Sequence, residues 1–461
     1  MQIDGFLGFV GERAVELEFP RRRNGYAGWT VLAGRNGSGK TSLLRCMALL
    51  LAGHRVVPAL APDYATWALP ARTVAGMQAE FFMDAADLKQ LRVPDPPRHP
   101  GVHARTALRI PPPETLKRSG TSVRFQLSPR WSQVLSEGGA VGGEVEELRM
   151  DEEIFPASFA AGYGPFRRLS SEFPDPLSTH ATLRDPSDLA ESAGRFSTLF
   201  QEDASLGESV SWIVGTYLRS LEKRAGATRL LETVLELLSD GLLPDGYEIA
   251  KVDSDGLWVR HCGLSFPLKR MSDGYRTVTA LVLDIVRHLH DFHGALRARR
   301  SRSGIAVHVP GVVLIDEIDA HLHVSWQQRI GEWLKQHFPK VQFIVTTHSP
   351  YICQSADPGG LIRLPGPGEA RGPEVVSEAT YRRVVYGSGD DAALSDLFGL
   401  DSPYSRQADE ARRQLIDLEE KVFSAAATEA EVRRYHELSE RLTSTLEARV
   451  DEVSGRLGRK S

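Results

Sequence analysis

Gly34-Arg35-Asn36-Gly37-Ser38-Gly39-Lys40-Thr41 is the stretch that decides the fold of this sequence. It matches the pattern G-x-x-x-x-G-K-[ST], the phosphate-binding P-loop. The apolar run 29–33 predicts a buried strand before the loop, and residues 42–50 predict a helix after it. A glycine loop between a strand and a helix directs backbone N–H groups and a helix N-terminus at phosphate oxygens. A chance glycine-rich turn would not explain both flanks, so the sequence predicts a nucleotide site.

The residues of this loop have distinct expected roles. Lys40 would reach the β- and γ-phosphates, and the Thr41 hydroxyl would bind Mg²⁺. Glycines would let the backbone approach the phosphates where a Cβ would crowd them. The expected cofactors are therefore ATP and Mg²⁺. The expected nucleotide-binding residues are Gly34, Asn36, Gly37, Ser38, Gly39, Lys40, Thr41 and Ser42.

Composition limits the class of protein. The chain has 461 residues, which suggests roughly two to four domains or one large domain with insertions. The net charge of −5 means that any contact with nucleic acid must come from a local basic patch. The cysteines Cys46, Cys262 and Cys353 lack C-x-x-C spacing, which argues against a disulfide framework or a zinc site. With no leader-like or membrane-spanning apolar run, we expect a cytoplasmic protein that does not enter a membrane.

A second apolar strand supplies the carboxylates that a P-loop needs. Leu314-Ile315-Asp316-Glu317 ends in two acidic residues. Asp316 is expected to hold the Mg²⁺ shell, and Glu317 to polarise the attacking water as a general base. The plainer alternative is a pair of capping carboxylates before a turn.

A third apolar strand, 341–347, is followed by His348. Its position after the carboxylate strand predicts that His348 donates to the γ-phosphate and responds to hydrolysis, whereas a strand-end histidine alone is usually structural.

Met271-Ser272-Asp273-Gly274-Tyr275-Arg276 stands at the head of a long apolar helix. Ser272 could simply cap that helix. A helix N-terminus with a glycine is also an anion site. Because this one has no phosphate motif of its own, we expect Ser272 and Gly274 to contact a nucleotide held by a second copy of the chain. The active unit would then be a dimer or a higher homo-oligomer with nucleotide between subunits.

Gly162-Tyr163-Gly164-Pro165-Phe166-Arg167-Arg168 follows a short apolar stretch, 154–161. A glycine turn that carries two arginines predicts an edge that senses phosphate. The alternative is a surface turn with solvated arginines.

The remaining stretches predict additions to an α/β nucleotide core. Each prediction rests on its period of apolar residues. They are a hairpin over 3–19, an antiparallel sheet from strands 78–83, 106–110 and 122–127, helices over 186–243, a hairpin over 247–260, a basic connector at 297–302, a helix over 325–337, a strand at 361–364 and two amphipathic tail helices within 404–455.

These motifs, in this order, resemble those of the ABC-type ATPases of the OLD, RecF and structural-maintenance-of-chromosomes group. The stretches 162–168, 318–323 and 397–402 resemble the AAA family ATPases of bacterial defence islands, among them the ATPase subunits of Septu anti-phage systems. The resemblance implies that Ser272 and Gly274 form the signature motif acting in trans, that 319–323 is the D-loop region and that His348 is the switch histidine. Relatives often have proline where this chain has Val324.

The resemblance implies a P-loop ABC-type ATPase fold with an antiparallel β subdomain, an inserted helical lobe and a C-terminal helical hairpin. We see no H-N-H cluster or TOPRIM acidic set in the sequence, so a separately encoded effector nuclease is the expected partner. The predicted division is an N-terminal ATPase lobe 1–185, a helical lobe 186–245, a C-terminal ATPase lobe 246–402 and a helical tail 403–461.

Two other functions stay open. One is a RecF-like DNA repair ATPase that binds DNA directly, for which Arg297–Arg302 is the only dense basic run. The other is a nucleotide-gated scaffold with negligible turnover.

Overall fold

The structure is a computed structural model, and it forms two compact units, Met1–Phe398 and Gly399–Ser461. The predicted four-part division is finer than this and stays a prediction. Predictions that fall on 84–100, 151–158 or 443–461 lie outside the described residues. The structure describes residues 1–20, 28–68, 75–83, 102–110, 114–115, 125–126, 130–137, 159–167, 188–302, 304–400, 402, 404–424 and 426–442.

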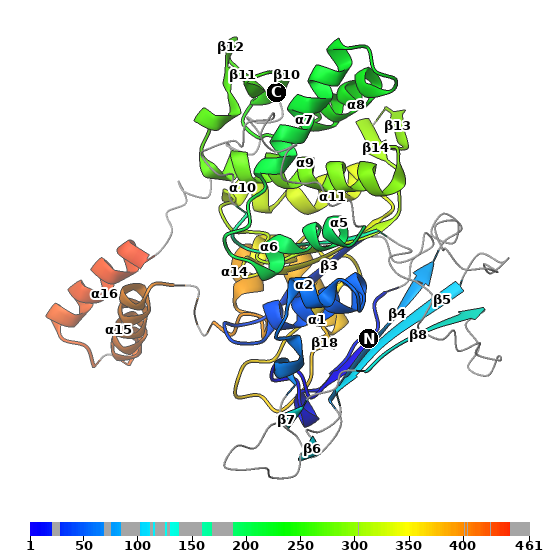
Figure 1. The fold of residues 1–461 in the computed structure, drawn as a ribbon. Helices are drawn as coiled ribbons and strands as arrows, with labels where there is room; N and C mark the ends of the chain where they lie inside the picture. The colour runs from blue at the N-terminus through cyan, green and yellow to red at the C-terminus, as the bar shows by residue number, and fades with distance from the viewer. Residues whose placement is uncertain are drawn as a thin grey trace. The chain divides into compact units, whose positions relative to one another are not determined.

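The first unit is built on a sheet whose strands run parallel except at one edge (Figure 1). The P-loop strand β3 lies beside β16, and β16 lies beside β15. Because the strands are parallel, their carboxyl ends meet at one edge, where α/β proteins bind ligands. The strand order is β18 (Glu374–Val375), β17 (Leu361–Arg363), β3 (Gly28–Ala33), β16 (Val341–Thr347), β15 (Gly311–Ile315) and β9 (Ala160–Tyr163).

Alternate residues of these strands enter two different hydrophobic clusters. Leu32, Leu314 and Ile344 pack in the cluster that contains the P-loop helix α1 (Lys40–Ala52). Their neighbours in sequence, such as Val31 and Val345, pack in the cluster on the other face. A strand that is buried on both faces reads as a continuous apolar run, because successive side chains point to opposite faces. This is why the sequence predicted these strands correctly.

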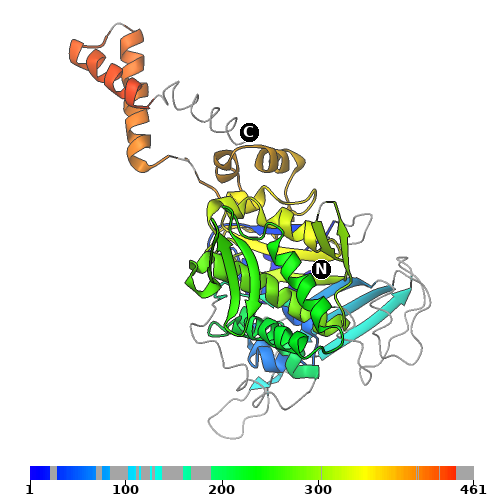
Figure 2. The ribbon, with the colours of Figure 1, turned by 90° about the horizontal axis from the view of Figure 1, so that it is seen from above.

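An antiparallel sheet adjoins the P-loop helix, as predicted. Its order is β2 (Val15–Glu16), β1 (Gln2–Asp4), β4 (Ala75–Met83), β5 (Val102–Ile110) and β8 (Arg130–Glu137). The predicted N-terminal hairpin is present, with Ile3 opposite Val15. Figures 1 and 2 show β4, β5 and β8 projecting away from α7 and α8.

The strand predicted over 122–127 was placed wrongly. Its described part is β7 (Phe125–Gln126), which pairs with β6 (Glu114–Thr115) in a separate small sheet. Its place beside β5 is taken by β8, whose amphipathic pattern the prediction missed.

The helical lobe follows β9. Its later helices pack against α9 (Asp273–His293), whereas Phe196 and Leu199 in its first part pack in the cluster that contains α1. This confirms the predicted helices over 186–243. They are α5 (Asp188–Gly194), α6 (Ser197–Phe200), α7 (Gly207–Leu221) and α8 (Ala227–Ser239). The predicted hairpin after them is β10 (Glu248–Asp253) and β11 (Gly256–His261), extended by β12 (Leu264–Pro267).

Two further predictions need correction. The basic connector contains a strand, β13 (Ala298–Ser301), which pairs with β14 (Gly304–Val307) and places Arg300 in an ion pair of 2.6 Å with Glu236. The helix predicted over 325–337 is divided into α10 (Val324–Gln327) and α11 (Ile330–His337).

Short elements complete the first unit. They are η1 (Gly11–Arg13), α2 (Val57–Leu60), η2 (Tyr64–Trp67), η3 (Leu268–Arg270), α12 (Pro350–Cys353), α13 (Glu378–Tyr386) and α14 (Gly389–Ala393).

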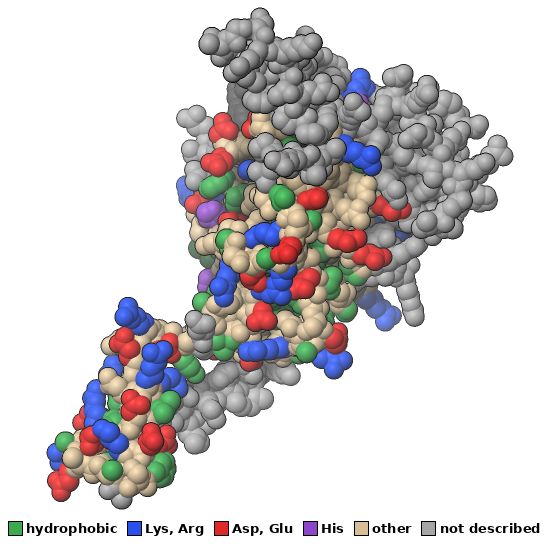
Figure 3. Space-filling view, turned by 90° about the horizontal axis from the view of Figure 1, so that it is seen from below, with side chains coloured by type: hydrophobic (Ala, Val, Ile, Leu, Met, Phe, Trp, Pro, Cys, Tyr) green, Lys and Arg blue, Asp and Glu red, His purple; other side chains and the backbone are tan. Residues whose placement is uncertain are grey.

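The second unit is a helical hairpin of α15 (Arg406–Phe423) and α16 (Glu429–Leu442). Lys421 and Glu431 close it with an ion pair of 2.7 Å. Figure 3 shows basic and acidic side chains interspersed over this hairpin. None of the helices in the described ranges is long and apolar enough to cross a bilayer.

Candidate functional site

The P-loop joins β3 to α1 with the geometry that its pattern predicts. Helix α1 begins at Lys40, and Gly39 before it has a φ of 92°. A Cβ at Gly39 would also meet the Phe9 ring at 3.0 Å, so the left-handed backbone and the packing both require glycine there. The backbone N–H groups of the loop and those at the N-terminus of α1 therefore lie next to each other.

Lys40 lies folded into the loop. Its Nζ donates hydrogen bonds to the carbonyl oxygens of Gly34 at 2.8 Å and of Arg35 at 3.1 Å. The side chain is buried, and this burial lowers the pKa of Lys40 to about 8, against the opposing effect of Asp316, Glu317 and Asp319. The ammonium group stays charged at neutral pH, which suits a phosphate ligand.

The two carboxylates at the end of β15 have different surroundings. Asp316 is buried, and its Oδ1 accepts a hydrogen bond of 2.5 Å from the Thr346 hydroxyl at the end of β16. Its Oδ2 is buried without a hydrogen-bond partner among the described residues, as is the Oγ of Ser38 in the P-loop. Since buried polar atoms are nearly always paired, these two atoms mark a place for a ligand.

Glu317 holds an unusual backbone conformation. Its φ is 45°, in the left-handed region, which costs on the order of 1–3 kcal/mol for a residue with a side chain. The Thr346 hydroxyl accepts a hydrogen bond from its N–H at 2.7 Å, and Arg167 donates one to its carbonyl oxygen at 2.9 Å. Side chains from two other strands or their loops therefore hold the backbone of Glu317.

Arg167 fits neither reading of its motif. It is 2% exposed and directs its guanidinium at backbone carbonyls, so it is neither a solvated surface arginine nor an exposed phosphate sensor. Burial lowers the pKa of Arg167 to about 10, which leaves it charged at neutral pH. The motif also begins inside β9, because Gly162 and Tyr163 pair with β15. Arg168 lies outside the described residues.

His348 and Asp319 meet at the end of β16. Asp319 Oδ1 accepts hydrogen bonds from the Thr347 hydroxyl at 2.5 Å and from the His348 backbone N–H at 3.4 Å. Burial, and then Lys40, lowers the pKa of His348, so its imidazole is neutral at pH 7. Asp319 was predicted only as part of the D-loop region. The sequence signal that could have singled out Asp319 is its position three residues after Asp316.

The structure groups the predicted residues into two sets. Lys40 interacts electrostatically with Asp316 and Glu317, and the His348 pKa responds to these same groups. Ser272 is exposed at the start of α9, with no side-chain capping bond there. Among the described residues outside its own helix, only His321 lies within 4 Å of a Cβ built on Gly274. Ser272 and Gly274 therefore lie beside the D-loop region rather than in the Lys40 group.

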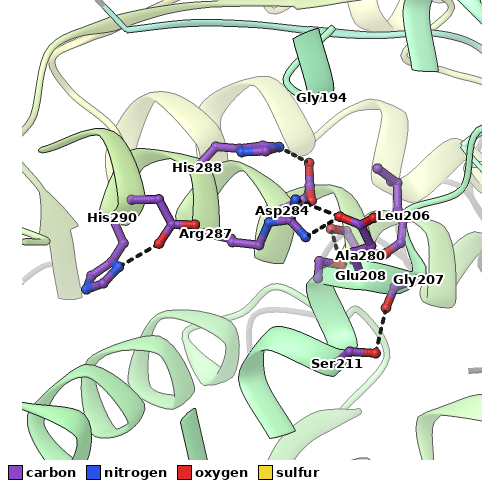
Figure 4. Close-up of polar contacts among 12 residues, drawn as sticks. Gly194, Leu206, Gly207, Glu208, Ser211, Ala280, Asp284, Arg287, His288 and His290 are labelled. Carbon is purple, nitrogen blue, oxygen red and sulfur yellow. Dashed lines mark hydrogen bonds and ion pairs between the residues drawn. The ribbon is translucent and has the colours of Figure 1, made fainter. Parts of the chain in front are cut away.

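A buried polar network links helix α9 to this edge of the sheet. Asp284 lies 3.2 Å from His288 Nε2 and accepts a hydrogen bond of 3.1 Å from the Tyr163 hydroxyl. Arg287 contacts Asp284 and also donates to Glu208 at the start of α7 (Figure 4). The Tyr163 carbonyl in turn accepts a hydrogen bond of 2.7 Å from the Asp316 N–H. Sequence reasoning missed this network, because Tyr163 and Glu208 lie far from Asp284 and Arg287 in the chain.

The residues present fit a magnesium nucleotide. The free Asp316 oxygen and the Thr41 hydroxyl are hard oxygen donors of the kind that Mg²⁺ prefers. Within the described ranges, no group of three His, Cys, Asp or Glu side chains could hold a metal by itself. Mg²⁺ is usually bound by one or two carboxylates together with substrate phosphates, so Asp316 and a bound nucleotide would together supply its ligands.

Known proteins and protein families resemble parts of this chain. Residues 149–354 match a family model described as "AAA domain, putative AbiEii toxin, Type IV TA system", and residues 1–60 match one described as "AAA domain". The "Septu protein PtuA" of Bacillus mycoides (strain KBAB4) is 47% identical over 83 residues, or 18% of this chain and 10% of that protein. The chain resembles the ABC-type ATPases of bacterial defence systems. The "Retron Ec83 probable ATPase" of Escherichia coli is 43% identical over 94 residues, or 20% of this chain and 16% of that protein.

A longer match extends the likeness to these defence ATPases. The "Septu protein PtuA" of Bacillus thuringiensis is 28% identical over 193 residues, or 40% of this chain and 47% of that protein. The chain thus matches less than half the length of each of these relatives. A solved SMC head domain bound to the C-winged helix domain of ScpA aligns at 15% identity and a TM-score of 0.41, over 77% of this chain and 91% of that chain.

Proposed function

We propose that the protein is an ATPase that binds ATP with Mg²⁺ at the P-loop and hydrolyses it. The observation that carries this is the position of Lys40. It is a buried cation at the start of a helix, it interacts with the carboxylates after β15, and it lies at an edge where Asp316 Oδ2 and Ser38 Oγ have no described partner. Such an arrangement stabilises the charge of phosphate groups and of a divalent cation together.

The proposed roles follow from the positions of the side chains. Lys40 and the N–H groups of residues 34–42 hold the phosphates, while Thr41 and Asp316 hold Mg²⁺. Glu317 accepts the proton of the attacking water as general base. The neutral His348 donates a hydrogen bond to the γ-phosphate. The magnesium ion would neutralise the charge that develops on the phosphate oxygens.

We further propose that the active unit is a dimer with nucleotide between subunits. In support, Ser272 is exposed at the head of α9, and Gly274 contacts His321 rather than the P-loop. A phosphate held by a second copy would be the ligand of this helix N-terminus.

The resemblance to Septu and retron ATPases supports a role in bacterial defence against phage. In that role nucleotide binding and hydrolysis would hold or release a separately encoded effector nuclease. Direct binding to DNA has less support, because Arg300 in the basic run is paired with Glu236. Recovery of partners with and without ATP tests the effector, and a steep loss of DNA affinity with salt would favour the repair alternative.

Glu317→Gln tests the proposed chemistry. We expect phosphate release to fall by about 10²-fold or more, because a general base contributes about 10²–10⁴-fold. ATP-bound dimers should accumulate in light scattering. Glu332→Gln is the matched control, since Glu332 is exposed on α11 and paired with Lys335. Unchanged turnover in Glu317→Gln would show that this assignment is wrong.

Mixing two variants tests the dimer. Lys40→Ala removes the P-loop contact, and Ser272→Arg blocks the signature contact, so each variant alone should be inactive. A mixed dimer contains one complete site, so the mixture should regain turnover. If the mixture stays inactive while both variants dimerise, the contact is not delivered by a second copy.

A further inference from the structure

We propose that Arg167 is a positioning residue. By donating hydrogen bonds to the backbone carbonyls of Asp316 and Glu317, it holds the general base Glu317 in place. This inference rests on the proposed function of Glu317. The role of Arg167 is separate from it, because the contacts made by its guanidinium are to the backbone of the protein.

The guanidinium makes its described contacts with backbone oxygens. Nη1 donates to the carbonyl of Asp316 at 2.7 Å and to that of Gly164 at 3.0 Å, and Nη2 donates to the carbonyl of Glu317 at 2.9 Å. The planar fork of arginine suits two adjacent acceptors in a fixed geometry. One side chain therefore ties the turn after β9 to the turn after β15.

The conformation of Glu317 explains why such a tie is needed. A left-handed backbone at a residue with a side chain persists only where its surroundings determine it. The N–H of Glu317 is held by Thr346 and its carbonyl by Arg167. The Ala320 N–H also donates to that carbonyl at 2.9 Å. Without Arg167 the Glu317 carbonyl would keep this backbone bond but lose its described side-chain partner, which would let the turn shift and displace the Glu317 carboxylate.

Position matters strongly for this carboxylate. A general base must lie within hydrogen-bond distance of the proton that it removes. A displacement of about 1 Å can lower a rate by about 10²-fold. The expected effect of losing Arg167 is therefore on the chemical step, with little effect on the phosphate contacts of Lys40.

The chain offers a matched control for the loss of a buried arginine. Arg195 is 4% exposed, and its guanidinium bonds to Ser192 and Glu191 near the end of α5. Arg195→Ala removes the same charge from a similarly buried place without touching the turn at Glu317. Both variants should lose stability. A difference between them in turnover would therefore arise from the position of Glu317 and not from a loss of folded protein.

The experiment compares Arg167→Ala, Arg167→Lys and Arg195→Ala in the full chain. We expect Arg167→Ala to lower kcat by about 10²-fold while the affinity for ATP, measured by calorimetry, changes less than about threefold. Arg167→Lys should recover part of the rate, because an ammonium can reach one of the two carbonyls. Adding Arg167→Ala to Glu317→Gln should cost little more than Glu317→Gln alone.

Hydrogen exchange without nucleotide supplies a readout that does not depend on activity. Amide exchange of a peptide that spans 312–320 should rise in Arg167→Ala and stay unchanged in Arg195→Ala. Equal losses of kcat in the two alanine variants, or unchanged exchange over 312–320, would overturn the inference. Absence of turnover in the wild type would instead overturn the proposed function, and the exchange result would still decide whether Arg167 holds this turn.

Discussion

Lys40 Nζ donates a hydrogen bond of 2.8 Å to the carbonyl oxygen of Gly34, the first residue of the P-loop. The lysine thus fills its own loop and must exchange these carbonyls for phosphate oxygens when nucleotide binds. Because the Lys40 pKa lies at about 8, the charge that attracts the phosphates is sensitive to mildly alkaline pH.

ATP affinity should therefore fall as the pH rises above about 8. A bound phosphate favours the charged lysine, so binding above the free-site pKa takes up a proton. Each pH unit should then lower the affinity by up to about tenfold. Calorimetry between pH 7 and pH 9.5 measures this. Lys40→Arg keeps its charge across this range and should bind with a nearly flat profile. A steep profile in that variant would assign the pH dependence to another group.

Asp284→Asn should destabilise the protein at neutral pH. His288, followed by Arg287, lowers the Asp284 pKa in spite of burial, which alone would raise it. Removing one partner of a buried charge network costs about 3–5 kcal/mol. Because the folded-state pKa lies below the ordinary value of 3.8, ionised Asp284 stabilises the fold at pH values above 3.8. This contribution is lost as the pH falls through the folded-state pKa.

Urea unfolding at pH 7 and at pH 3 measures this effect. The difference between wild type and Asp284→Asn should be large at pH 7 and smaller at pH 3. The control is Asp291→Asn, because Asp291 pairs with His290 at a partly exposed place on the same helix. Such a surface pair contributes about 0–1 kcal/mol. Equal effects of the two substitutions at pH 7 would contradict a structural role for the Asp284 network.

Gly274→Ala should disturb the start of α9. A Cβ there would lie 2.4 Å from the His321 carbonyl oxygen, and His321 already has a φ of 65°. We expect a loss of about 1–3 kcal/mol, which is typical of an overpacked site, together with lower ATP turnover. Gly194→Ala on α5 is the control, because a Cβ there meets nothing within 4 Å. Thermal unfolding and phosphate release of both variants measure the difference.

Much of the nucleotide edge could be predicted from the sequence. The P-loop is a contiguous pattern, and the strands before Asp316 and His348 are continuous apolar runs because they are buried on both faces. Parallel pairing then brings the three strand ends together. Two of the predictions that failed concern a charged stretch and a short one. Residues 297–302 were read as a connector because their arginines hid the pairing of β13 with β14, and 122–127 carried too short a pattern to fix its partner strand.

Local patterns of residues thus determined the P-loop, the order of the motifs and the α/β core. Only the tertiary structure decided what Arg167, Asp319 and Asp284 do. Arg167 lies 149 residues before the carbonyl of Asp316 that it binds, and Tyr163 lies 121 residues before Asp284. A buried arginine and a solvated one look alike in sequence, because burial depends on which distant strands pair beside them. The strain at Glu317 is decided in the same way, by groups that the fold brings to its N–H and its carbonyl oxygen.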